Sequence, residues 1–127
     1  MTKISSGLRT LFLVHFVFGL IFGLFYLFIP GMFLGWFGVT LLDENAYRTA
    51  GAAVLAFSAS SWLCYQAAEW ERVKIVVLAE IVWTVLVTLL SLYTLLFAGA
   101  APAFWINVII MAGFAGAFIY FYSKKGV

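Results

Sequence analysis

The chain has 127 residues, of which 66% are hydrophobic, 20% aromatic and only 9% charged, with a formal net charge of +2. Soluble domains carry about 25% charged residues, so this chain has too few polar side chains to cover a surface exposed to water. The composition excludes a soluble globular domain, a nucleic-acid-binding protein and a disordered chain. It predicts an integral membrane protein with a single domain over residues 1–127.

Four apolar stretches are long enough to cross a bilayer. A helix needs about 20 apolar residues to cross a hydrocarbon core about 30 Å thick. The predicted spans are residues 8–29, 46–68, 72–97 and 102–122. The first stretch is longer than the apolar core of a signal peptide, which has about 7–15 residues, so we expect it to be retained. The fold class expected is all-α, an antiparallel four-helix transmembrane bundle.

The connection between the first two spans is unusually apolar. The first span ends at Pro30, which together with the glycine after it interrupts the helix. Residues 31–42 are too apolar for a solvated loop and too few to cross the bilayer. They predict an interfacial segment that lies along the membrane surface, with Trp36 at the lipid headgroups. Thr40 and Asp43 fit the pattern of a capping box, which would start the second helix early.

The positions of the Lys and Arg residues predict the orientation of the spans. With four spans, both termini and the second loop share one side and hold six of the seven, namely Lys3, Arg9, Arg72, Lys74, Lys124 and Lys125. The opposite side holds Arg48. Cytoplasmic loops of membrane proteins are enriched in Lys and Arg. We therefore expect a multi-pass protein of the plasma (cytoplasmic) membrane, with the N- and C-termini in the cytoplasm.

Two ionisable residues, His15 and Glu80, lie well inside the predicted spans. Ionisable groups in the hydrocarbon are costly and are therefore candidates for function. Counted from the cytoplasmic ends of their helices, both lie about 10–12 Å deep, and Ser61 lies at a matching depth. Thr84 follows Glu80 by four residues and Tyr65 follows Ser61 by four, so each pair shares a helix face.

These five residues, Glu80, His15, Ser61, Thr84 and Tyr65, form the candidate ligand- or proton-binding site. The alternative is that their polar groups only join one helix to another by hydrogen bonds. The sequence leaves both interpretations open.

The sequence has few of the residue patterns that are typical of enzymes or metal sites. One histidine and one cysteine, Cys64, provide no metal site within a single chain, and we expect no cofactor. His15, Ser61 and Glu80 could be arranged as a triad, but the sequence has no nucleophile elbow or oxyanion-hole motif. We predict no catalytic residue, and a protein without enzymatic activity is favoured.

Two features resemble small four-span bacterial and archaeal membrane proteins that are loosely DoxX-like. One is a first span that ends at a Pro-Gly break, at Pro30, and is followed by an aromatic-rich connection. The other is the segment from Tyr47 to Leu55, with the sequence YRTAGAAVL, which opens the second span. The resemblance implies a fold rather than an activity.

Two classes of function remain open. One is the binding or transport of a small lipophilic molecule or ion through an intramembrane site at Glu80 and His15. The other is an accessory or assembly protein that docks other membrane helices. The expected partners are the lipid bilayer, a small lipophilic ligand or ion, and a second copy of the chain or another membrane protein. No nucleic-acid partner is expected.

Overall fold

The computed structural model describes residues 2–127, and its regular structure in this range is helical. Its five helices are α1 (Ser6–Phe28), α2 (Pro30–Gly35), α3 (Glu44–Ala67), α4 (Trp70–Phe97) and α5 (Phe104–Ser123). The expectation of an all-α protein is therefore confirmed. Three of these helices, α1, α4 and α5, are long and apolar enough to cross a membrane. α3 is long enough but less apolar, because it is rich in alanine, glycine and serine.

α3 begins with a capped N-terminus, but the cap differs from the one predicted. Asp43 is the N-cap, and its Oδ1 accepts hydrogen bonds from the backbone N–H of Asn45 at 2.9 Å and of Ala46 at 3.4 Å. The predicted capping box was wrong, because Thr40 lies outside the helix. A carboxylate directly before the helix already satisfies the free N–H groups of the first turn, so the helix does not start earlier.

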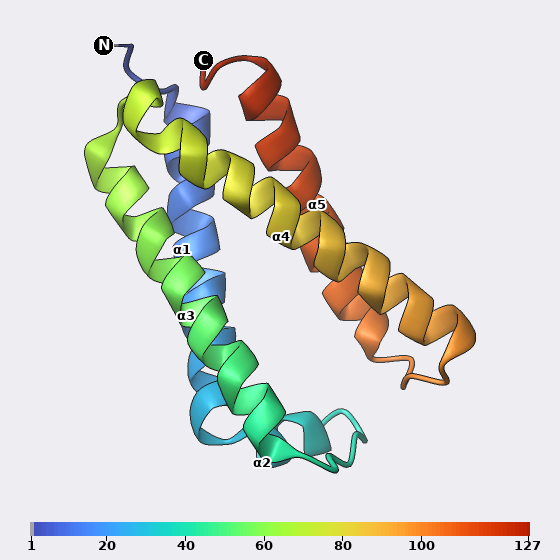
Figure 1. The fold of residues 1–127 in the computed structure, drawn as a ribbon. Coiled ribbons are helices and arrows are strands. Elements are labelled where there is room, and N and C mark those ends of the chain that lie inside the picture. The colour runs from blue at the N-terminus through green and yellow to red at the C-terminus, as the bar shows by residue number, and fades with distance from the viewer. Residues whose placement is uncertain (1) are drawn as a thin grey trace.

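The short helix α2 follows α1 after a break at Ile29 and lies at the end of the molecule opposite the two termini (Figure 1). Its first residue is Pro30, which suits a helix start because that position needs no N–H donor. Phe33 is buried, whereas Met32 is 59% exposed and Trp36 is 61% exposed. One side of this segment therefore packs on the protein and the other is free to face its surroundings.

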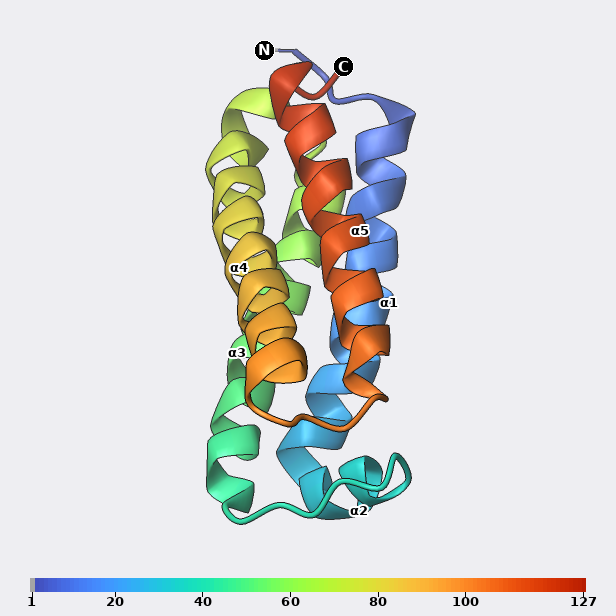
Figure 2. The same ribbon diagram turned by 90° about the vertical axis from the view of Figure 1, so that its right-hand side faces the viewer.

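The long helices form two antiparallel pairs. α1 packs mainly against α3, and α4 packs mainly against α5 (Figures 1 and 2). Glycines bring α1 and α3 close together, because a Cβ atom added at Gly19 would lie 2.8 Å from Ser58 Cβ. At Gly23, an added Cβ would lie 2.7 Å from Leu55. Small residues at this spacing are typical of close helix contacts in membranes.

The two pairs are joined at the end that carries the termini and diverge toward α2 (Figure 1). A core of apolar side chains fills the joined end: Leu8, Phe12, Cys64, Trp70, Val73, Val77, Phe114 and Phe118. Backbone hydrogen bonds tie the N-terminal segment to both pairs, from Ile4 N–H to Ala68 O at 3.0 Å and from Ser5 N–H to Gly126 O at 2.7 Å. This end is therefore the closed end of the molecule.

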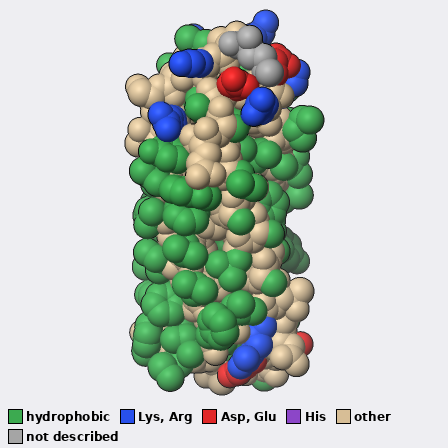
Figure 3. All heavy atoms as spheres, turned by 90° about the vertical axis from the view of Figure 1, so that its left-hand side faces the viewer, with side chains coloured by type: hydrophobic (Ala, Val, Ile, Leu, Met, Phe, Trp, Pro, Cys, Tyr) green, Lys and Arg blue, Asp and Glu red, His purple; other side chains and the backbone are tan. Residues whose placement is uncertain are grey.

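The surface is divided into an apolar middle and two charged ends. On the face drawn in Figure 3, hydrophobic side chains cover the middle, and the Lys, Arg, Asp and Glu side chains gather at the top and bottom. Many large apolar residues on the three candidate spans are exposed, among them Ile75 at 73% and Ile109 at 70%. Such a wide apolar band would be unfavourable in water but is expected of a surface that faces lipid.

Candidate functional site

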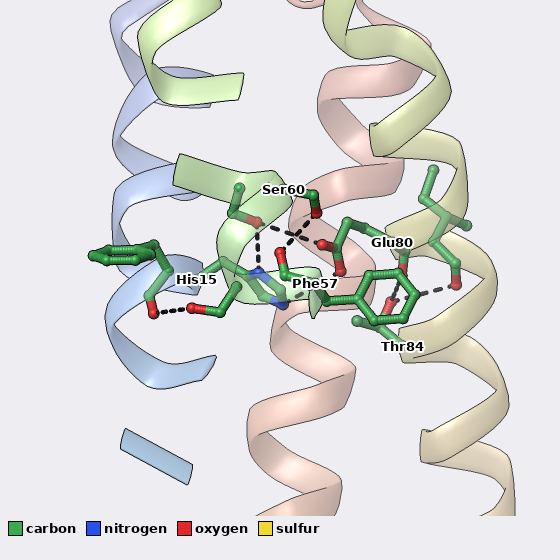
Figure 4. Close-up of polar contacts among 9 residues, drawn as sticks. His15, Phe57, Ser60, Glu80 and Thr84 are labelled. Carbon is green, nitrogen blue, oxygen red and sulfur yellow. Dashed lines mark hydrogen bonds and ion pairs between the residues drawn. The ribbon is translucent and has the colours of Figure 1, made fainter. Parts of the chain in front are cut away.

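Three polar side chains from three helices meet inside the molecule. His15 of α1, Ser61 of α3 and Glu80 of α4 are 6%, 0% and 0% exposed. His15 Nδ1 lies 2.8 Å from Ser61 Oγ, and His15 Nε2 lies 3.3 Å from Glu80 Oε2. Ser61 Oγ is also 3.4 Å from Glu80 Oε1. Figure 4 shows the imidazole of His15 and the carboxyl of Glu80 pointing toward each other. These three residues are called the His15 cluster below.

The contact between His15 and Glu80 differs from the other two contacts of the cluster. Glu80 Oε2 faces His15 Nε2 but lacks the alignment of a hydrogen bond, so this buried oxygen has no hydrogen-bond donor among the described residues. Glu80 Oε1, in contrast, accepts from the Ser61 hydroxyl. Oε2 is therefore the carboxyl oxygen with free capacity to take up a proton.

Among the arrangements of hydrogen atoms that the cluster can hold, two with a neutral imidazole differ by one proton. In the first, Glu80 is a carboxylate, Nε2–H of His15 faces it, and the Ser61 hydroxyl donates to Nδ1. In the second, the cluster holds one more proton: Oε2–H faces Nε2, Nδ1–H donates to Ser61, and Ser61 donates to Oε1. The second arrangement closes a ring and carries no net charge. Uptake of one proton would convert the first arrangement, which carries one negative charge, into the second, which carries none. The difference matters because charge is costly in an apolar interior.

Two aromatic rings of α5 hold the histidine in place. The His15 ring packs edge-on against Phe114, with ring centroids 4.8 Å apart, and against Phe118, at 5.5 Å. The sequence analysis did not include these phenylalanines in the site. Their spacing of four residues, which places both on one face of the fifth helix, was the signal that could have identified them.

The remaining candidate residues behave differently. Thr84 is fully buried beside Glu80, but its hydroxyl donates to the backbone oxygen of Glu80 at 2.6 Å. It thus lies next to the cluster without a side-chain bond to it. Tyr65 is not part of the cluster: its ring stacks on Trp62 with centroids 5.5 Å apart, and the Arg9 guanidinium lies 4.5 Å from the centre of the same ring.

Two further serines of α3 form hydrogen bonds outside the cluster. Ser60 donates to the backbone oxygen of Phe57 in its own helix at 2.7 Å (Figure 4). Ser58 donates across the helix contact to the backbone oxygen of Phe16, also at 2.7 Å. These hydroxyls satisfy backbone acceptors, so they stabilise the helices rather than extend the cluster.

A cavity of about 500 Å³ lies between the two helix pairs, on the side of the cluster that faces α2. All five helices contribute to its walls, and most of the lining side chains are aromatic or aliphatic. His15 is the member of the cluster that reaches this lining. No Lys, Arg, Asp or Glu side chain belongs to the lining found among the described residues. The volume and the apolar walls are typical of a site for a small molecule.

The cavity has the size and apolar walls that suit a small apolar molecule, and the His15 cluster lies beside it. Comparison with other proteins adds nothing to this description, because no protein-family model, no curated protein and no solved structure matches the chain.

Proposed function

We propose that this protein binds or transports a small lipophilic molecule or ion in the cavity between its helix pairs, with binding linked to protonation of the His15 cluster. The observation that carries the proposal is the position of His15. Its Nε2 faces the carboxyl of Glu80, whose two oxygens are buried, and the same side chain lines the cavity. A change in the charge of Glu80 would therefore alter the electrostatic environment of a molecule bound in the cavity, because only the imidazole of His15 separates the two.

The membrane arrangement is part of the proposal. α3 is 24 residues long and packs along α1, one of the three candidate spans. This packing supports a second crossing of the bilayer by α3 beside α1. We therefore infer four spans with α2 at the interface, in the plasma membrane, with both termini in the cytoplasm as the Lys and Arg distribution predicts. This arrangement agrees with the resemblance to DoxX-like four-span proteins.

Because binding is linked to protonation, the affinities of two probes should change with pH in opposite directions. A small aromatic cation, phenyltrimethylammonium, should bind more tightly when Glu80 is a carboxylate, so its affinity should rise with pH. Naphthalene, which is uncharged, should bind more tightly when the cluster is neutral, so its affinity should fall with pH. Equilibrium dialysis of the protein in lipid nanodiscs, with empty nanodiscs as blank, measures both affinities across a series of pH values.

The matched variant is Glu80→Gln, which keeps the size and most of the hydrogen bonding of the side chain but cannot titrate. It should bind both probes with no dependence on pH. Thr88→Val is the control on the same helix, because the Thr88 hydroxyl bonds the backbone oxygen of Thr84 at 2.7 Å. If the wild type binds neither probe, or binds both without a dependence on pH, the proposal is wrong and an accessory protein becomes the better interpretation.

A further inference from the structure

A second polar contact lies in the same cavity, distant from the His15 cluster. Asn107 of α5 donates from Nδ2 to Ser91 Oγ of α4 at 2.8 Å, and both residues line the cavity. Ser91 follows Glu80 by eleven residues on α4, so it lies about 16 Å farther along the helix axis. The cavity therefore has His15 on its wall near the closed end of the molecule and the Ser91–Asn107 contact farther along α4.

The amide of Asn107 has hydrogen-bonding capacity to spare. The bond to Ser91 uses one amide hydrogen, and no other hydrogen bond of this side chain joins it to a described residue. Its carbonyl oxygen accepts no hydrogen bond from a described residue, and it is not fully buried. An amide in apolar surroundings is unfavourable unless its donors and acceptors are paired. An accessible amide on the wall of an apolar cavity is thus suited to hold a polar group of a ligand.

The neighbouring hydroxyls do not offer the same capacity. Thr88 donates to its own helix at Thr84 O, and Thr94 donates to Ser91 O at 3.0 Å. Ser91, in contrast, is joined through its hydroxyl to Asn107 of α5. The amide of Asn107 and the hydroxyl of Ser91 are therefore a pair held between two helices, and both residues belong to the cavity wall.

We infer that Ser91 and Asn107 bind the hydroxyl or carbonyl group of an uncharged lipophilic ligand, whose apolar body lies along the aromatic walls toward His15. This inference rests on the proposed function, because it assigns the ligand of that cavity to a chemical class. The class follows from the lining: a hydroxyl or carbonyl matches the amide, and the described lining beside Ser91 and Asn107 has no Lys, Arg, Asp or Glu side chain that would pair with a charged headgroup at this position.

The experiment compares two probes that differ by one hydroxyl, tritiated 1-naphthol and tritiated naphthalene. Equilibrium dialysis of the protein in nanodiscs, corrected with empty nanodiscs, gives both affinities at one pH. Asn107→Leu removes the amide and should weaken 1-naphthol binding roughly five- to tenfold, which is the effect of one hydrogen bond. It should leave naphthalene binding unchanged. Thr88→Val is the control and should alter neither affinity.

Naphthalene binding also reports whether the cavity of each variant is folded. If Asn107→Leu binds no naphthalene, Asn107→Ala is measured in its place, and the expected ratio of affinities is the same. Equal weakening of both probes in both variants would overturn the inference, because the amide would then only stabilise the contact between α4 and α5. If the ratio of the 1-naphthol affinity to the naphthalene affinity is the same in the variants as in the wild type, the inference is also wrong, whereas the proposed function would stand. A wild type that binds neither probe would end both proposals.

Discussion

His15 and Glu80 meet across the boundary between the two helix pairs, with Nε2 of the histidine 3.3 Å from Oε2 of the glutamate. His15 belongs to the α1–α3 pair and Glu80 to the α4–α5 pair, and direct packing between the pairs is much less extensive than packing within them. The contact also lies where the packed core ends and the cavity begins. It can therefore influence both the stability of the bundle and the contents of the cavity.

The first prediction measures the energy of that contact. In a double-mutant cycle with His15→Phe and Glu80→Gln, the coupling free energy of unfolding should be about 0.5–3 kcal/mol, as for other residues in one buried network. Unfolding in mixed micelles with increasing sodium dodecyl sulfate measures it. The control cycle pairs Glu80→Gln with Ser60→Ala, because the Ser60 hydroxyl bonds its own helix, and should give no coupling. Equal coupling in the two cycles would contradict the prediction.

The second prediction concerns the contact between α1 and α3. Gly19→Ala should destabilise the protein by about 1–3 kcal/mol, because the added Cβ would overlap Ser58 and force the helices apart. Gly113→Ala is the matched control, since an added Cβ there meets nothing within 4 Å. The same unfolding titration compares the two variants. A Gly19 variant as stable as the Gly113 variant would mean that the two helices are packed less closely than described.

The third prediction tests the start of α3. Asp43→Ala should lower the free energy of unfolding by about 1 kcal/mol, because two backbone N–H groups lose their acceptor. Asp43→Asn keeps a side-chain oxygen at the cap and should stay close to the wild type. Thr40→Ala should have no effect, since Thr40 lies outside the helix. A larger loss for Thr40→Ala than for Asp43→Ala would restore the capping box expected from the sequence.

The fourth prediction tests the proposed topology. Reporter fusions at Gly126 and at Glu69, in the connection between α3 and α4, should both report the cytoplasmic side. A fusion at Gly99, in the connection between α4 and α5, should report the opposite side, because one span separates it from Glu69. Each fusion is made in two versions, with a reporter active only inside and one active only outside. A cytoplasmic signal at Gly99 would rule out the four-span arrangement.

Much of this architecture could be predicted from the sequence because it depends on local composition. The lengths of the apolar stretches predicted helices, and the structure has them at Ser6–Phe28, Glu44–Ala67, Trp70–Phe97 and Phe104–Ser123. The depth of a residue in a helix follows from the rise per residue, and that calculation placed His15, Ser61 and Glu80 at one level. The second stretch was predicted to be a span like the other three, but its helix, α3, is not among the three helices apolar enough to cross a membrane.

The lateral arrangement of the helices could be decided only by the tertiary structure. Depth along a helix says nothing about which neighbour a side chain faces, so Tyr65 looked equivalent to Ser61 in the sequence but lies against Trp62 and Arg9. The cavity depends on the two pairs diverging toward α2, which results from the packing of side chains distant in the chain. For the same reason the phenylalanines beside His15 and the accessible amide of Asn107 emerged only once the helices were placed together.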